Sequence, residues 1–341
     1  MKRRVAVLMG GRSAERDVSL ATGLQVLNAL DPDRYEVYAL DTASGERFLP
    51  AEMNRPVAQL TAVDGRPVNA LTALPTVALA ERPNVVFIAL HGPGGEDGSV
   101  QGFLETLGIP YTGSGVLASA LAMDKMRCKI FLGTENIVTP PGLVLTRDDA
   151  PRLRRAGNEV ARNLGFPVVV KPSRQGSTYG CTVATDAETL TDALTEAFRY
   201  DDTVLVEQRI FGTEITVAVL GNREPFALPV VEIVPPDGFF DYQSKYSQDE
   251  AVAAREIVPA RIDEEIAREA QEIAVRCHRL LGCRGMSRTD MFVTDYGEVI
   301  TLEINTIPGM TVTSLLPKAA AAAGIPFPEL MDRLIAYAVE K

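Results

Sequence analysis

Two acids and an amide alternate with apolar residues in the segment SRTDMFVTDYGEVITLEINT, residues 287–306. Its two halves read as paired strands, which sets Asp290 opposite Glu303 and Arg288 opposite Asn305 on one face. Such hard oxygen donors bind Mg²⁺ well. A solvated polar face is the alternative. The apolar residues interleaved with the acid favour a metal site of Asp290, Glu303 and Asn305.

The register of this hairpin depends on its turn. Tyr296 and Gly297 are predicted to form a two-residue turn, which would pair Asp295 with Glu298. Counting back from that pair in single steps produces the alignment of the four polar side chains given above.

A lysine at the end of an apolar run is a second candidate for chemistry. In VVVKPSRQGSTYG, residues 168–180, three valines lead into Lys171 and a Gly/Ser-rich stretch follows. The spacing is not that of a Walker motif. A glycine-rich loop can still approach a phosphate closely and donate several backbone N–H groups to it. Lys171 is therefore a candidate phosphate contact, and the alternative is that it only ends a strand. Lys125 and Lys245, each taken alone, are expected to be solvated surface lysines.

Neither of the two histidines indicates a function by itself. His91 lies beside Gly92, where a histidine usually satisfies backbone groups in a turn. His278 lies in a helix dense with charges and is assigned no role.

The first third of the chain supplies the elements that would position some of these groups. Strand-like RVAVLM, YEVYAL and NVVFIAL alternate with helix-like segments, which predicts a parallel, doubly wound sheet. Ligands bind at the carboxyl ends of such strands, where Glu15 and His91 are expected. The apolar run at Val5 to Met9 is predicted to be the first strand rather than an export signal.

The rest of the chain predicts two further units. We expect an N-terminal Rossmann-like substrate domain at 1–122, a central domain at 123–212 and a C-terminal domain at 213–341. The central domain should contain a helix across 149–164, and the C-terminal one a helix capped by Asp263 and ended by Gly282. The polar stretch at 235–255 is predicted to be a long loop that closes as a lid.

The composition of the chain excludes some classes of function. The chain has 341 residues, 46% hydrophobic and 23% charged, as in a globular protein, and a formal net charge of -11. That charge argues against nonspecific binding of nucleic acid, which needs a basic surface. Four scattered cysteines predict free thiols and a cytoplasmic location. No apolar run approaches the roughly 20 residues that would cross a bilayer, so no membrane association is expected.

Seven segments, in this order along the chain, closely resemble the D-alanine–D-alanine ligase family, which has the ATP-grasp fold: GGRSAERDVSL, HGPGGEDGSVQGFLE, MDKMRCK, KPSRQGSTYG, FFDYQSKY, GCRGMSRTDMFV and EINTIPGMT. The resemblance runs from Val5 to about Leu334. It implies an α/β and α+β fold, with an N-terminal parallel-sheet (pre-ATP-grasp) domain and ATP held between the other two domains. It also implies a cytoplasmic, homodimeric enzyme that joins two D-alanines through a D-alanyl phosphate, releases ADP and phosphate, and serves peptidoglycan synthesis.

The resemblance assigns nucleotide and metal contacts. Two lysines would contact phosphates, two acids the adenine and ribose side, and three apolar residues the adenine ring; the expected ATP contacts are Lys125, Lys171, Ser177, Glu207, Glu214, Phe239, Lys245, Phe292 and Leu302. Two Mg²⁺ ions, for which Mn²⁺ can substitute, would bind Asp290, Glu303 and Asn305.

The resemblance also assigns the substrate groups. Glu15 would hold the ammonium of the first D-alanine, with His91 nearby. Ser177 and Tyr246 would link to Glu15 and position the loop over the site. The oxyanion and the second D-alanine would be held by Arg288, Gly309, Ser314 and Leu315.

Two alternatives stay open at this point. A D-alanine–D-lactate ligase would carry a different loop from the one in which Tyr246 resembles the dipeptide-forming type. A nonenzymatic nucleotide-binding regulator should have lost metal or phosphate groups, which are all present here. The chain departs from common family forms at Gln175, Tyr179, Thr289 and Val312, which leaves the behaviour of the phosphate loop open.

Overall fold

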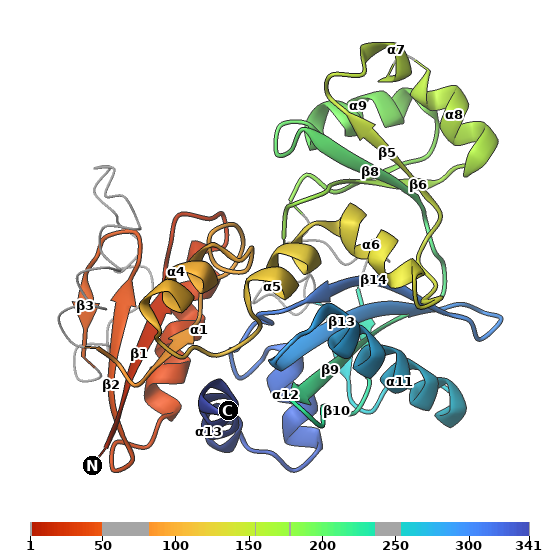
Figure 1. Ribbon diagram of the computed structural model, residues 1–341. Coiled ribbons are helices and arrows are strands. Elements are labelled where there is room, and N and C mark those ends of the chain that lie inside the picture. The colour runs from red at the N-terminus through yellow and green to blue at the C-terminus, as the bar shows by residue number, and fades with distance from the viewer. Residues whose placement is uncertain (1, 50–81, 154, 177–178, 236–253, 341) are drawn as a thin grey trace.

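The computed structural model describes residues 2–49, 82–153, 155–176, 179–235 and 254–340 (Figure 1). Within them the strands form three sheets. Four of the residues singled out above, Ser177, Phe239, Lys245 and Tyr246, lie outside the described residues, as does most of the stretch predicted to form a lid. The end of that stretch differs from expectation, because Arg255 already begins a strand.

The N-terminal sheet has the strand order β3-β2-β1-β4. Three of its strands are parallel, as predicted: β1 (Arg3–Met9), β2 (Tyr35–Asp41) and β4 (Val85–Ile88). The short β3 (Arg47–Phe48) adds an antiparallel edge. Helices α1 (Arg16–Ala29) and α4 (Ser99–Leu107) follow β1 and β4, so the predicted alternation of strands and helices is confirmed.

The central sheet is antiparallel, in the order β5-β8-β6-β7. Three helices lie on one side of it (Figure 1). The strands are β5 (Gly142–Thr146), β6 (Val168–Pro172), β7 (Thr182–Ala184) and β8 (Thr203–Gln208), and the helices are α7 (Ala150–Leu153), α8 (Ala156–Asn163) and α9 (Ala187–Ala197).

The single helix predicted across 149–164 is wrong, because the structure has α7 and α8 in its place. Asp149 begins α7 by accepting the backbone N–H of Arg152 at 3.1 Å. The Arg152 carbonyl then accepts the N–H of Arg155 three residues later, a turn that ends the short helix. The apolar spacing across this segment is continuous, so periodicity alone does not reveal the break.

The C-terminal sheet has the order β12-β11-β9-β13-β14, and β10 pairs with β9 at the other end of that strand. Its strands are β9 (Thr213–Gly221), β10 (Phe226–Ala227), β11 (Val231–Val234), β12 (Arg255–Ile257), β13 (Gly285–Val293) and β14 (Val299–Asn305). Helix α11 (Glu264–Leu281) packs on this sheet. As predicted, the Asp263 carboxylate accepts the Glu265 N–H and Gly282 ends the helix with a positive φ of 71°.

The hairpin of β13 and β14 confirms the predicted pairing at its functional end. Arg288 lies opposite Asn305 and Asp290 opposite Glu303. The predicted turn is wrong: Thr294, not Asp295, bonds with Glu298, and the turn contains three residues. An extra residue in β14, between the partners of Asp290 and Met291, restores the register. The two one-residue shifts cancel, which is why counting from the wrong turn still aligned the four polar side chains.

Three apolar clusters hold these layers together. The first spans the N-terminal sheet, part of the C-terminal sheet, and helices α12 (Leu315–Ala322) and α13 (Phe327–Val339). The second lies on the C-terminal sheet under α11 and includes residues of α5 (Val116–Met123) and α6 (Lys125–Gly133). The third belongs to the central sheet and its helices. Figure 1 shows α13 between the N-terminal sheet and α12, so the two ends of the chain share one core.

All four cysteines, Cys128, Cys181, Cys277 and Cys283, are free thiols in the structure. Burial raises the pKa of Cys128, Cys277 and Cys283 to about 12. Over the described residues, every helix is too short or too polar to pass through a bilayer.

Candidate active site

A cavity lies between the central and C-terminal sheets, and strand alternation selects the side chains that line it. On β6, Val168 and Val170 are fully buried in the core of the central sheet. The alternate residues Val169 and Lys171 point to the other face and line the cavity. Glu207 pairs with Val169 across the sheet and joins them on that face. One wall therefore combines an apolar surface with a cation and an acid.

Glu207 is shared by two lysines. Its side chain is buried and forms ion pairs with Lys171 of β6 and Lys129 of α6. Lys129 also donates to the Pro140 carbonyl at 3.3 Å. Burial and the charge of Lys171 lower the pKa of Lys129 to about 6, so Lys129 is largely uncharged at pH 7 until an anionic ligand nearby favours its protonated form.

Lys125 connects the cavity to the loop after β6. Its Nζ lies 3.2 Å from Glu303 Oε2 and donates to the Gln175 carbonyl at 2.7 Å. Burial alone would lower the pKa of Lys125, but the charge and the hydrogen bond of Glu303 outweigh it and raise the pKa. Lys125 is therefore a fixed positive charge at neutral pH.

The extra residue in β14 shapes the opposite wall. In a regular strand, consecutive side chains point to opposite faces. Because of the irregularity, the consecutive Leu302 and Glu303 both line the cavity, beside Phe292 and Asp290 of β13. Glu214 of β9, paired with Phe292, lines it as well. An apolar patch and a pair of carboxylates thus lie side by side.

Asp290 is held firmly in place. Arg288 donates to its two oxygens at 2.8 and 2.7 Å, and Thr216 Oγ1 donates to Oδ1 at 2.6 Å. The Asn305 side-chain oxygen accepts the Ile307 N–H at 3.0 Å. Among the described residues no group of three or more His, Cys, Asp or Glu is placed to hold a metal ion. A magnesium site here would therefore use two carboxylates and an amide, and take further oxygens from its ligand.

A pair of buried carboxylates lies at the carboxyl ends of the N-terminal strands. Glu15 precedes α1, and Glu96 follows β4 and accepts the Gly92 N–H at 3.1 Å. A Cβ on Gly176 would come 2.6 Å from a Glu15 oxygen and 3.5 Å from a Glu96 oxygen, so the loop after β6 covers both acids. Burial, and the charge of Glu15, raise the pKa of Glu96 well above its usual range. Two acids this close favour a bound cation.

His91 joins the N-terminal sheet to the segment after β14. Its Nε2 lies 3.2 Å from Thr22 Oγ1, and its ring also makes a hydrogen bond with the Ile307 backbone. Burial and the charge of Arg288 lower the pKa of His91 to about 4. His91 is therefore neutral at pH 7, beside an arginine of the C-terminal sheet.

The segment after β14 brings the last predicted residues together. Ser314 Oγ lies 2.7 Å from Thr311 Oγ1 and accepts the Thr311 N–H at 3.1 Å. A Cβ on Gly309 would come 3.0 Å from Ser314 Oγ, so the glycine backbone lies against this serine. Leu315 begins α12 and is buried. The Val312 N–H donates to the side chain of Gln25 in α1, which ties the segment to the N-terminal sheet.

Gln175 and Tyr179, two of the residues at which the chain departs from common family forms, both make hydrogen bonds. The Tyr179 hydroxyl donates to the Ala14 carbonyl at 3.2 Å, and the Gln175 side chain donates to the Tyr200 carbonyl at 3.3 Å. Tyr179 thus links the loop to the N-terminal part, next to Glu15.

Lys129 and Glu96 also belong to the site, although the sequence did not predict them. A signal for Glu96 existed, since it is an acid in the glycine-rich turn HGPGGEDG at the carboxyl end of a predicted parallel strand. Lys129 lies four residues after Lys125 on the same helix face, but its shared acid comes from a distant strand.

Known protein families match most of the chain. The family described as D-ala D-ala ligase N-terminus matches residues 4–114, and the family described as D-ala D-ala ligase C-terminus matches residues 131–336. A curated relative, the D-alanine--D-alanine ligase of Pelotomaculum thermopropionicum, is 43% identical and covers 100% of this chain and 98% of its own.

Solved structures agree in fold over the full length. The D-alanine--D-alanine ligase of Bacillus anthracis complexed with ATP has a TM-score of 0.75 and 31% identity, and covers 99% of this chain and 97% of its own. The VanG D-Ala:D-Ser ligase of Enterococcus faecalis has a TM-score of 0.78 and 32% identity, and covers 99% of this chain and 100% of its own.

Proposed function

The chain belongs to the D-alanine–D-alanine ligase family, and from that premise we propose how its residues carry out the reaction. The protein is an ATP-dependent ligase of the ATP-grasp fold that joins two D-alanines. The dipeptide serves peptidoglycan precursor synthesis. The observation that carries this function is the cavity in which two lysines and four carboxylates meet between apolar walls.

The cavity residues are assigned to ATP. Phe292 and Leu302 supply an apolar surface for the adenine ring, with Glu207 and Glu214 on its polar side. Lys125 and Lys171, which line the cavity, would neutralise the phosphates as the carboxylate of the first D-alanine attacks the γ-phosphorus and ADP leaves. Ser177, Phe239 and Lys245 remain predicted contacts outside the described residues.

The first D-alanine is assigned to the paired acids. Its ammonium would bind Glu15, and Glu96 beside it, whose pKa is raised in the free protein, would ionise more readily once that cation is bound. His91 is neutral at pH 7, in part because of the nearby charge of Arg288, and so adds no competing cation. The predicted links of Ser177 and Tyr246 to Glu15 fall outside the described residues.

The second step forms the peptide bond. The amine of the second D-alanine attacks the acyl carbon of D-alanyl phosphate, the C–O bond breaks, phosphate leaves, and the amine loses a proton. Arg288 and the Gly309 N–H are assigned to the oxyanion of the tetrahedral intermediate. Ser314 and Leu315 are assigned to the second D-alanine, since Ser314 lies against Gly309 and Leu315 follows it as the first residue of α12.

Two Mg²⁺ ions are proposed as cofactors, with Mn²⁺ able to replace them. Asp290, Glu303 and Asn305 would hold them, because their oxygens form a hard donor set at the cavity edge. Bound there, the metal would neutralise charge on the transferring phosphoryl group.

The remaining assignments concern the whole protein. We propose three domains, at 1–122, 123–212 and 213–341, a homodimer, and a cytoplasmic location. The separate apolar cluster of the central sheet supports an independent central domain, although α5 and α6 pack against the C-terminal sheet. Sedimentation of the purified protein tests the dimer.

Product analysis tests the function. The enzyme is incubated with ATP, Mg²⁺ and D-alanine, alone or with D-lactate or D-serine, at several pH values. D-alanyl-D-alanine, ADP and phosphate are expected in equal amounts. A preference for D-alanyl-D-lactate or D-alanyl-D-serine would assign the chain to a different acceptor, and ATP binding without any product would contradict the ligase assignment.

A further inference from the structure

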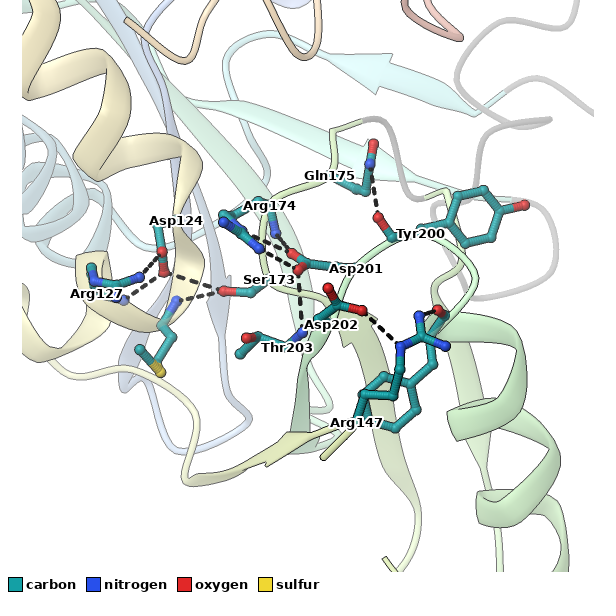
Figure 2. A network of polar contacts seen from close by, with 12 residues as sticks. Asp124, Arg127, Arg147, Ser173, Arg174, Gln175, Tyr200, Asp201, Asp202 and Thr203 are labelled. Carbon is teal, nitrogen blue, oxygen red and sulfur yellow. Dashed lines mark hydrogen bonds and ion pairs between the residues drawn. The ribbon is translucent and has the colours of Figure 1, made fainter. Parts of the chain in front are cut away.

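Two neighbouring arginine–aspartate pairs lie below the phosphate loop, and their surroundings differ sharply (Figure 2). Arg174 pairs with Asp201, and Arg147 pairs with Asp202. The two arginine side chains are about equally exposed, 56% and 52%. The two acids are not: the Asp201 side chain is 3% exposed and that of Asp202 is 78%.

Asp201 is saturated with hydrogen bonds. Arg174 donates to it from Nε at 3.2 Å, from Nη2 at 2.7 Å and from its backbone N–H at 2.8 Å. The Thr203 N–H donates at 3.2 Å. Burial opposes ionisation of this carboxyl, but the bonds from Arg174 and Thr203 outweigh it and lower its pKa. Because backbone and side chain of Arg174 bind the same acid, the conformation of this residue is fixed.

The residues on either side of Arg174 hold Lys125. Before it, the Ser173 carbonyl accepts the Lys125 N–H at 3.0 Å, and Ser173 Oγ donates to Asp124 at 3.2 Å. After it, the Gln175 carbonyl accepts the Lys125 ammonium at 2.7 Å. Both ends of Lys125, the backbone and the ammonium, are therefore positioned by the segment 173–176, here called the loop base.

The loop base ends at the carboxylates of the N-terminal part. Gly176 lies against Glu15, as the 2.6 Å distance for a Cβ at this position shows. A displacement of Arg174 would therefore move a phosphate-contacting lysine on one side and uncover Glu15 on the other. Within the described residues, the Arg147 side chain bonds instead to Asp202 and to the Phe198 carbonyl, on the side of the network away from Gln175 (Figure 2).

We propose that Arg174, held by its ion pair and hydrogen bonds with Asp201, is a positioning residue. It keeps the loop base in place and thereby shields the acyl phosphate from water. The inference rests on the proposed function, since it concerns the same intermediate. When the shield fails, water attacks the acyl carbon of D-alanyl phosphate and the C–O bond to phosphate breaks. Phosphate leaves, and D-alanine is regenerated with its carboxylate. ATP is then consumed without dipeptide.

The test compares Arg174→Gln with Arg147→Gln in the full-length enzyme. Phosphate release and dipeptide formation are measured together at saturating D-alanine, with the KM for ATP determined separately. We expect Arg174→Gln to release severalfold more phosphate per dipeptide than the unmodified protein and to raise the KM for ATP severalfold. Arg147→Gln should leave the ratio near one, and Arg174→Lys, which retains a charged donor, should restore part of the coupling.

The outcomes separate the two claims. An unmodified protein that makes no dipeptide contradicts the proposed function. Dipeptide formation with the same phosphate ratio in all four proteins overturns only the role of Arg174. An equal rise in Arg174→Gln and Arg147→Gln also overturns it, because the effect would then follow from loss of any surface arginine here. If Arg174→Gln makes neither product, Asp201→Asn, which removes the charge that pairs with Arg174, is measured instead: more phosphate than dipeptide would support shielding, and a ratio of one would overturn it.

Discussion

At the scale of single residues, the site depends on charges that are balanced before any ligand binds. Lys125 is paired with Glu303, Lys171 with Glu207, and Arg288 with Asp290. An ion pair between partly buried groups costs desolvation, which close geometry and added hydrogen bonds offset. In the proposed assignments, the cations of these pairs would face phosphate or oxyanion charge, and the acids would face the metal or the adenine.

The metal assignment predicts the effect of Glu303→Gln. The variant keeps the shape and an oxygen that can accept from Lys125, but removes a charged metal ligand. We expect kcat to fall by roughly 100-fold or more, since metal neutralisation of the phosphoryl group is worth several kcal/mol. The thermal midpoint should change little. Steady-state rates over a Mg²⁺ series test this, and near-normal turnover at saturating Mg²⁺ would contradict the assignment.

Because of the buried His278, the free energy of unfolding should depend on pH. It is buried, with Nδ1 2.8 Å from Ser287 Oγ and Nε2 3.2 Å from the Gly221 carbonyl. Because a carbonyl only accepts, Nε2 carries the proton and Nδ1 accepts from the serine. Burial lowers the pKa of His278 to about 4, from about 6.5 for an exposed histidine.

The direction of this pH dependence follows from proton uptake by the unfolded chain. As pH falls from 6.5 to 4, the unfolded chain binds a proton at His278 that the folded protein excludes, so unfolding is favoured. The loss should reach about 3 kcal/mol near pH 4 and be absent above pH 7. Denaturant unfolding at pH 7 and pH 5 tests this: the decline should be shallower in His278→Gln. Equal slopes in both proteins would show that this histidine does not titrate on unfolding.

At the scale of elements, close approach of the loop base to α1 predicts a steric effect. In Gly176→Ala the new methyl group would overlap Glu15, so the loop and the acid must separate. We expect kcat/KM for D-alanine to fall on the order of 100-fold, as an ångström of misplacement can cost. Gly133→Ala, at a position where a Cβ meets no atom, is the matched control. Equal kinetics in the two variants would show that Gly176 tolerates a side chain.

The hairpin shows how far sequence reasoning reached and where it stopped. Alternation and local pairing aligned Asp290 with Glu303, because these depend on neighbouring residues in one element. The three-residue turn and the extra residue in β14 were missed, since each is a local departure from regular pairing. The link of Arg174 to Asp201, and of Gly176 to Glu15, joins separate elements whose packing no spacing along the chain encodes.

At the scale of the whole molecule, the shared core predicts coupled stability. Leu334 of α13 is 1% exposed, in the cluster that also contains the N-terminal sheet. Leu334→Ala should cost about 2–5 kcal/mol and speed hydrogen exchange in both β1 and β9. Leu190→Ala, in the separate central cluster, should speed exchange in β6 and β8 instead. If Leu334→Ala affected only the C-terminal sheet, the core would not act as one unit.

That shared core also has a consequence for biosynthesis. Helix α13 contacts α1 and β4, yet Phe327 follows Ile88 by about 240 residues. At about 5–20 residues per second, a ribosome takes on the order of 10–50 s to bridge that interval. During this time the nascent N-terminal sheet lacks the helix that completes its apolar core. We therefore expect nascent chains of this enzyme to depend on ribosome-associated chaperones until the last helix emerges.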